Sequence, residues 1–392
     1  MTTETTVAGA LAIGPLEVWP PVVLAPMAGV TNPPFRSICR EHGAGLYVSE
    51  MVIARAIVEM RWGAAPKGGK SYRSTRKVIE FAPGESPRSI QLYGTDAWSV
   101  GEAIRRLADH DHVDHVDLNF GCPVRKVTRH GGGSALPVKR ALLASIMKAA
   151  VDAAGSIPVT VKFRKGVDDD HLTYLDTGRI AEDVGVAAIA LHARTAEQLY
   201  SGTADWPAIA RLKETVSSIP VLGNGDIWEA PDAIAMMAAT GCDGVVVGRG
   251  CLGRPWLFGQ LADLFDGREM RRPPLLGEVC DTLVHHGELL IEWLGHEADA
   301  MRQFRKHTGW YLAGYPVGSP VRAALNQVRT MSEVRRLLDT VDRSLPLPLD
   351  GMRLMRGHQA GPQKVTVPYG WFDDPDDVTP LPAEAAADGS GG

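Results

Sequence analysis

Along residues 20–272, short apolar runs rich in β-branched residues alternate with longer stretches whose apolar positions repeat at helical spacing. The short runs are typical of buried strands, and stretches such as 141–154, 175–184, 206–216 and 230–239 are typical of amphipathic helices. Alternating strands and helices indicate βαβ units and a parallel sheet. Eight such units predict a (β/α)8 TIM barrel over 20–272, with strands at Val22–Ala25, Gly45–Ser49, Ser89–Leu92, His115–Leu118, Val159–Lys162, Ala188–His192, Val221–Gly223 and Gly244–Gly248.

The pattern becomes purely helical after Pro274. We expect a separate helical domain over 273–345, with helices at Leu275–Leu294, Ala298–His307, Ser319–Gln327 and Ser332–Asp342. Residues 1–19 are expected to form an N-terminal extension. Residues 346–392 are rich in Ala, Gly, Pro and Asp, a composition that predicts a disordered tail.

The composition is that of a globular protein, with 45% hydrophobic and 22% charged residues. No apolar run approaches the length of about 18 residues that a membrane span needs, and no secretory signal is visible. The 5 cysteines form no Cys-x-x-Cys pair and no Cys/His cluster at metal spacing. A cytoplasmic monomer without a structural metal is therefore expected.

The net charge of -5 argues at first against a nucleic-acid partner. However, residues 367–392 carry acids and neither Lys nor Arg, so the rest of the chain is close to neutral. The acidic tail is interpreted as a solubilising end, and competition with RNA for a basic face is the alternative.

Polar residues follow the ends of the predicted strands, where TIM barrels place their chemistry. A single polar residue there is more often a turn or cap. A complete series on one barrel face indicates a binding site, and it comprises Gln91, Asn119, Cys122, Lys162, Arg164, His192, Arg194, Asn224, Asp226 and Arg249.

The fourth strand leads into Asn119-Phe120-Gly121-Cys122-Pro123, and Gly131-Gly132-Gly133 follows. A cysteine before proline in a glycine-rich turn is suited to presenting a thiol to a site, although a buried inert thiol is the alternative. The segment Gly248–Gly253 also matches G-x-G-x-x-G. It closes the series of units, and no second βαβ half follows, so we interpret the match as incidental.

These motifs together resemble the tRNA-dihydrouridine synthases, and most of all their bacterial B-type branch. The resemblance spans about residues 20–345. It rests on Pro26–Asn32 with Pro34-Phe35-Arg36, Ser49-Glu50-Met51, Gln91–Gly94, Asn119–Pro123, His192–Thr195, Asn224-Gly225-Asp226, and Gly248-Arg249 with Gly253–Trp256.

The resemblance implies reduction of tRNA uridine to dihydrouridine by FMN, with NADPH or NADH as reductant. Cys122 is then the general acid that protonates C5 of uracil after hydride reaches C6. Asn119, Lys126 and Arg194 are expected near the uridine or its phosphate. The residues expected to bind FMN are Ala25, Pro26, Met27, Gln91, Lys162, His192, Asn224, Gly225, Asp226, Gly248 and Arg249.

Each of these assignments has a physical basis. Lys162 can place a cation beside the flavin, although a salt bridge across the barrel top is the alternative. Gln91 can both donate to and accept from the pyrimidine edge of the ring. Gly225 and Gly248 let backbone N–H groups approach the phosphate, and Arg249 adds positive charge there.

The helical domain is basic between Arg302 and Arg336, and Trp310, Tyr311 and Tyr315 interleave with the cations. Such a surface can bind phosphates and stack bases of tRNA, but a solvated helix face with core aromatics has the same pattern. The segment 55–87, with Lys67, Lys70, Arg73, Arg76 and Lys77, is a second basic candidate. Two alternatives to a tRNA enzyme stay open: an FMN oxidoreductase acting on a free pyrimidine, and a non-enzymatic RNA-binding protein.

Overall fold

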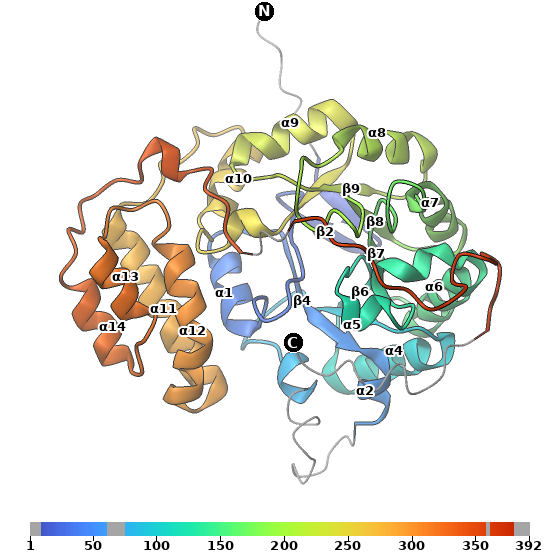
Figure 1. The fold of residues 1–392 in the computed structure, drawn as a ribbon, viewed down its shortest axis with the longest axis horizontal. Helices are drawn as coiled ribbons and strands as arrows, with labels where there is room; N and C mark the ends of the chain where they lie inside the picture. Colours follow the sequence, from blue (N-terminus) through green and yellow to red (C-terminus); the bar gives the residue numbers. More distant parts are fainter. Residues whose placement is uncertain (1–8, 61–74, 358–360, 380–392) are drawn as a thin grey trace, which may run out of the picture.

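The computed structural model describes residues 9–60, 75–357 and 361–379. Within them, eight parallel strands close into a barrel in the order β10-β3-β4-β5-β6-β7-β8-β9, which confirms the predicted TIM barrel (Figure 1). The strands are β3 (Val22–Leu24), β4 (Leu46–Ile53), β5 (Ser89–Tyr93), β6 (His115–Phe120), β7 (Val159–Arg164), β8 (Ala188–His192), β9 (Val221–Asn224) and β10 (Gly244–Val247).

The barrel helices cover the outside of the sheet with their apolar faces. In α6 (Arg140–Ala154), for example, Leu142, Leu143, Ile146 and Met147 are buried at helical spacing. The others are α1 (Pro33–Glu41), α2 (Ala54–Val58), α4 (Ala97–Asp111), α5 (Arg125–Thr128), α7 (Tyr174–Asp183), α8 (Trp206–Thr215), α9 (Ala230–Thr240) and α10 (Leu257–Phe265), with 3-10 turns η1 (Gly133–Val138) and η2 (Arg249–Cys251).

Strand register brings several predicted site residues to one level of the barrel. Asn119 on β6 pairs with Lys162 on β7, and Arg164 pairs with His192 on β8. His192 in turn pairs with Asn224 on β9. Because parallel strands end together, these side chains meet at the carboxyl-terminal face of the barrel.

The other end of the barrel is closed by a hairpin of β1 (Leu11–Ile13) and β2 (Leu16–Val18). Leu11, Ile13 and Val18 are buried against inward-facing residues of the barrel such as Leu46 and Leu222. The hairpin lies within the expected N-terminal extension, where sequence analysis predicted no strands.

The helical domain contains α11 (Leu276–Leu294), α12 (Glu297–Tyr311), α13 (Ser319–Leu325) and α14 (Met331–Leu338), followed by η3 (Leu349–Gly351). It has its own core, in which Leu283, Phe304 and Val334 are buried. Figure 1 shows it beside the barrel next to α1, and α11 packs against α1.

The structure contradicts the expectation of a disordered tail from residue 346 onward. Residues 361–379, which we call the C-terminal strap, lie against the barrel, and Trp371 is buried with Val138 and Val167. The acidic, proline-rich composition did not predict this order, because a few apolar side chains are enough to anchor a short segment. Residues 380–392 lie outside the described residues. No helix in the described ranges has the length and apolar character that a membrane crossing requires.

Candidate active site

The turn after β6 is organised by the side chain of Asn119. Its Oδ1 accepts hydrogen bonds from the backbone N–H groups of Gly121 (3.0 Å) and Cys122 (2.9 Å). Its Nδ2 donates to Oε1 of Gln91 at 2.8 Å. An amide fits this position because it can donate to the neighbouring strand and accept from the turn at once.

Both backbone polar groups of Cys122 are hydrogen-bonded. Its carbonyl accepts from the backbone N–H (3.0 Å) and the hydroxyl (3.1 Å) of Ser134 in η1. Burial raises the pKa of the Cys122 thiol, while the Val124 backbone N–H and the charge of Arg164 act in the opposite direction. The thiol is therefore protonated at neutral pH, as a proton donor must be.

Gln91 connects Asn119 to a buried carboxyl group below the site. Its Nε2 donates to Asp117 at 2.6 Å, and Thr160 donates to the same carboxyl at 2.7 Å. Burial raises the pKa of Asp117. One N–H of Gln91 and one lone pair of its carbonyl are left over for a ligand.

Two buried cations, Lys162 and Arg164, lie at the end of β7 near one buried carboxyl group, that of Asp117. Neither Lys162 nor Arg164 forms an ion pair with any residue in the described ranges. Burial, with Arg164 as a second cause, lowers the pKa of Lys162 to about 8, while the Asp117 carboxyl acts in the opposite direction. Arg164 donates to the carbonyls of Gly121 (3.0 Å), Thr195 (2.9 Å) and Leu199 (2.8 Å). Together with burial, these charges hold the pKa of His192 well below 6.5, so its imidazole is neutral.

The turn after β9 depends on a buried ion pair. Asp226 accepts from Arg194 at 2.8 Å and from the backbone N–H of Ala204 at 2.7 Å. Gly225 has a φ of +134°, and a Cβ there would lie 2.6 Å from the Cβ of Ala204, so only glycine fits. Arg194 thus holds the turn and lies beneath the cavity surface.

Arg249 follows the turn at Gly248 after β10. Its guanidinium lies 4.5 Å from the centre of the Tyr200 ring and 5.1 Å from that of Trp228, in cation–π geometry. A Cβ atom added to Gly248 would meet no atom closer than the Cβ of Ala25, at 3.6 Å. The backbone of Gly248 is therefore accessible from the cavity.

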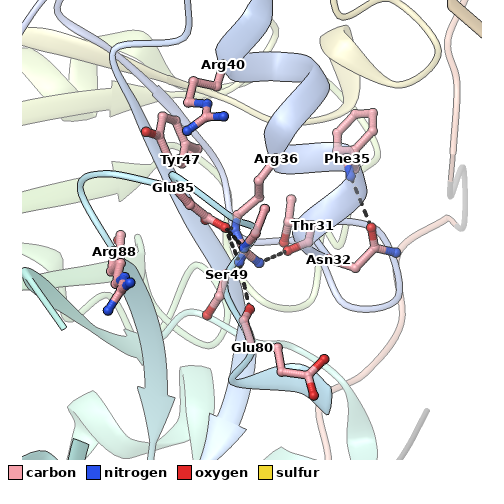
Figure 2. Close-up of polar contacts among 12 residues, drawn as sticks. Thr31, Asn32, Phe35, Arg36, Arg40, Tyr47, Ser49, Glu80, Glu85 and Arg88 are labelled. Atoms are coloured by element: carbon pink, nitrogen blue, oxygen red, sulfur yellow. Dashed lines mark hydrogen bonds and ion pairs between the residues drawn. The ribbon is translucent and has the colours of Figure 1, made fainter. Parts of the chain in front are cut away.

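The loop after β3, which carries Pro26 and Met27, is held by a buried ion pair (Figure 2). The Met27 N–H donates to the Thr31 hydroxyl at 3.0 Å, and the Thr31 carbonyl accepts from Arg36 at 2.7 Å. Arg36 also forms a bidentate pair with Glu85, with Nη2 to Oε2 at 3.0 Å. Arg36 belongs to the sequence signature, and the structure gives it a supporting role.

All these elements border one cavity of about 640 Å³ at the carboxyl-terminal face. It brings together every predicted site residue except Lys126 and Arg194, namely Ala25, Pro26, Met27, Gln91, Asn119, Cys122, Lys162, His192, Asn224, Gly225, Asp226, Gly248 and Arg249. Lys126 instead lines a separate small pocket with Tyr93 and His130.

Other lining residues were not predicted as site residues, among them Tyr200, Trp228, Lys306 and Trp310. Tyr200 and Trp228 follow β8 and β9 in loops where no motif marks them. Lys306 and Trp310 come from α12, where the basic and aromatic pattern was the only signal.

The structure divides the basic helical pattern into different roles. Tyr311 and Tyr315 are buried in the core of the domain, so for these two residues the alternative of core aromatics holds. Arg305 and Arg322 donate to backbone carbonyls within the domain. Arg302, Arg329, Arg335 and Arg336 are exposed.

The second basic candidate is only partly described. Lys67, Lys70 and Arg73 lie outside the described residues. Arg76 pairs with Asp111 at 3.0 Å, and Lys77 pairs with Glu80 at 3.0 Å. In the described ranges no group of three or more His, Cys, Asp or Glu side chains is placed to hold a metal ion.

Comparison with known proteins gives the family. The family model described as dihydrouridine synthase matches residues 23–345. This chain belongs to the dihydrouridine synthase family. The family model ends at Leu345, so the C-terminal strap lies beyond it. Family membership supports a flavin cofactor, and the cavity suits one: it offers an apolar floor at Ala25–Met27 and the cation of Lys162.

Named relatives agree with the family. A probable tRNA-dihydrouridine synthase of Mycobacterium tuberculosis H37Rv is 54% identical, over 98% of this chain and 97% of the relative. That of Mycobacterium leprae is 51% identical, over 94% of this chain and 100% of the relative. tRNA-dihydrouridine synthase B of Xanthomonas axonopodis pv. citri is 40% identical, over 82% of this chain and 92% of the relative.

Some solved structures resemble the chain only weakly. An example is 6-hydroxypseudooxynicotine amine oxidase from Pseudomonas geniculata N1, with 16% identity, a TM-score of 0.47, and coverage of 70% of this chain and 52% of that one.

Proposed function

We propose that this protein is a cytoplasmic tRNA-dihydrouridine synthase. It reduces uridine in tRNA to 5,6-dihydrouridine, with FMN as cofactor and NADPH as reductant. Uridine, NADPH and a proton give dihydrouridine and NADP⁺, so electrons and protons balance. The observation that carries the proposal is that a protonated thiol, Cys122, and a cation without an ion pair among the described residues, Lys162, face one cavity.

When bound, FMN supplies the hydride that C6 of the uracil ring receives, and NADPH restores it. Cys122 then gives the proton to C5. The resulting thiolate lies close to the Val124 N–H and the Arg164 charge, the two groups that favour its ionised form. Proton return from solvent restores the thiol.

Lys162 and Arg249 are proposed to hold the negative parts of the cofactor. Lys162 would supply positive charge beside the flavin ring, and Arg249 with Gly225 and Gly248 would hold its phosphate group. Ala25, Pro26 and Met27 form the floor, while Gln91, His192, Asn224 and Asp226 border it. Asn119 orients Cys122, and Lys126 stays a proposed contact of the tRNA. Arg194, expected near the uridine, is buried, so its proposed role is to hold the Asp226 turn.

A uridine within folded tRNA must leave its stack to enter this cavity, at a cost of a few kcal/mol. The helical domain is placed to assist, because Lys306 and Trp310 border the cavity and exposed arginines lie on the same domain. We propose that phosphates of tRNA bind these cations while the target base enters the cavity.

The test is a position-by-position map of dihydrouridine in tRNA from cells that lack the gene. We expect loss at defined uridines, restored by the wild-type gene but not by Cys122→Ala, since a general acid contributes about 10²–10⁴-fold. Unchanged dihydrouridine in a strain without redundant relatives would contradict the proposal and favour a free pyrimidine as substrate.

A further inference from the structure

The C-terminal strap connects three loops of the catalytic face (Figure 1, red). After β8, the Glu197 carbonyl accepts from the Gln363 N–H at 2.9 Å. After β7, the His171 ring stacks on Phe372 with centroids 3.9 Å apart. After β6, the Ala135 carbonyl accepts from the indole N–H of Trp371 at 2.8 Å.

Trp371 is the main anchor of this strap. It is 5% exposed and packs against Val138 and Val167. The ammonium of Lys139 lies 5.1 Å from the centre of its ring and donates to the Asp374 carbonyl at 2.6 Å. A buried indole with its N–H satisfied contributes both apolar burial and a fixed orientation.

The strap also completes the start of α6. The first N–H groups of a helix have no partner within it. Here the N–H of Arg140, the first residue of α6, donates to the Pro375 carbonyl at 2.7 Å. The strap therefore holds η1 through Ala135 and holds the helix that follows η1 through Arg140.

η1 is in turn the element that supports Cys122. Both donors to the Cys122 carbonyl come from Ser134. Gly133, with a φ of +55°, fits so closely that a Cβ would lie 2.5 Å from the same carbonyl. A shift of η1 therefore moves the backbone of Cys122.

We propose that Trp371 is a positioning residue for the Cys122 thiol, acting through η1. The inference rests on the proposed function, in which Cys122 donates the proton. It adds a determinant from beyond residues 23–345, the region that the family model covers.

The first experiment uses the full-length flavin-loaded protein and measures its two half-reactions separately. We expect Trp371→Ala to slow oxidation of the reduced enzyme by tRNA about tenfold or more, because a 1 Å misplacement costs up to about 10²-fold. The apparent affinity for tRNA and reduction by NADPH should change less than twofold. Tyr369→Ala is the matched control, since Tyr369 lies on the same strap and is fully exposed.

A double-mutant cycle separates positioning from a general structural role. In the Cys122→Ala background, Trp371→Ala should have no further effect on the tRNA-dependent step. An equal loss with and without the thiol would overturn the proposal. If Cys122→Ala alone keeps the wild-type rate, the proposed function fails, whereas a wild-type rate in Trp371→Ala alone overturns only the positioning role.

Thiol alkylation gives a readout that needs no turnover. We expect iodoacetamide to modify Cys122 several-fold faster in Trp371→Ala, with no change at the buried Cys39, Cys242, Cys251 and Cys280. If circular dichroism shows that Trp371→Ala does not fold, Trp371→Phe decides, because it keeps a ring but removes the hydrogen bond. An unchanged Cys122 alkylation rate in that folded variant would overturn the proposal.

Discussion

Two of the regions that hold buried cations have different surroundings. Below the β3 loop, Arg36 is paired with Glu85 and also donates to the carbonyls of Thr31 and Glu80 (Figure 2). In the cavity, Lys162 and Arg164 form no ion pair among the described residues, although the Asp117 carboxyl acts on Lys162 without one, and burial lowers the pKa of both, to about 8 and about 10.

The difference distinguishes a cation that supports the fold from cations that are available to a ligand. The Arg36–Glu85 pair is complete in itself and fixes the loop that carries Met27. The cavity cations remain incompletely compensated, an arrangement that destabilises the folded protein until an anionic ligand supplies the missing charge. Because Lys162 and Arg164 also line the cavity, their incompletely compensated charge is available to an anionic ligand there.

The largest expected effect comes from breaking the complete pair. Glu85→Ala leaves Arg36 buried without its partner, and we expect a loss of about 3–5 kcal/mol in the free energy of unfolding. Urea denaturation of the flavin-free protein measures it. The control is Asp152→Ala, which removes an exposed pair with Lys148 and should cost at most about 0.5 kcal/mol. Equal losses in both variants would remove the distinction.

Replacing a cavity cation should lower the reaction rate without lowering the stability of the protein. Lys162→Met removes the charge that burial penalises, so the flavin-free protein should be at least as stable as the wild type. The flavin-dependent rate should fall about 10²–10³-fold, the usual effect of removing one stabilising donor. Urea denaturation and tRNA reduction assays on one preparation test both parts, and a strongly destabilised Lys162→Met protein would contradict the comparison.

The depressed pKa of Lys162 also predicts a dependence on pH. Below about pH 8, Lys162 is protonated in both folded and unfolded flavin-free protein, so the full penalty of burial applies. Between about 8 and the ordinary lysine pKa of about 10.4, only the unfolded state keeps the proton, and stability rises with pH. The free energy of unfolding should be measured for the wild type and for Lys162→Met from pH 7 to 9.5. The difference between the two proteins should show this rise.

The smallest effect is expected at exposed cations, which pay no cost of burial. Arg336→Ala on the helical domain should leave folding unchanged and reduce the salt dependence of tRNA binding by about one unit of slope. Binding titrations at several salt concentrations measure the slope. Arg179→Ala, on the exposed surface of α7, serves as the control and should leave it unchanged.

The barrel was predictable because its strands are short, apolar and regularly spaced, and strand order then placed their polar ends together. Two proposed substrate contacts were placed less well, because a strand-end position does not show where a side chain points. Arg194 turns inward to Asp226, and Lys126 faces another pocket. The Arg36–Glu85 pair joins residues 49 positions apart and has no local signal.

The terminal elements were the hardest to predict. The β1–β2 hairpin has only three residues in each strand, too few for a clear alternation. The strap has the composition of a disordered segment, and its order depends on tertiary contacts of Trp371 and Phe372 that composition does not record.

The strap also has a consequence for the order in which the protein is made. Trp371 follows its partner Ala135 by 236 residues, so the ribosome completes the barrel strands well before it makes the anchor. At about 5–20 residues per second, the time between synthesis of Ala135 and of Trp371 is roughly 10–50 s. The nascent barrel therefore closes before the strap supports the turn that carries Cys122. The last described segment of the chain to be synthesised completes the carboxyl-terminal face of the barrel.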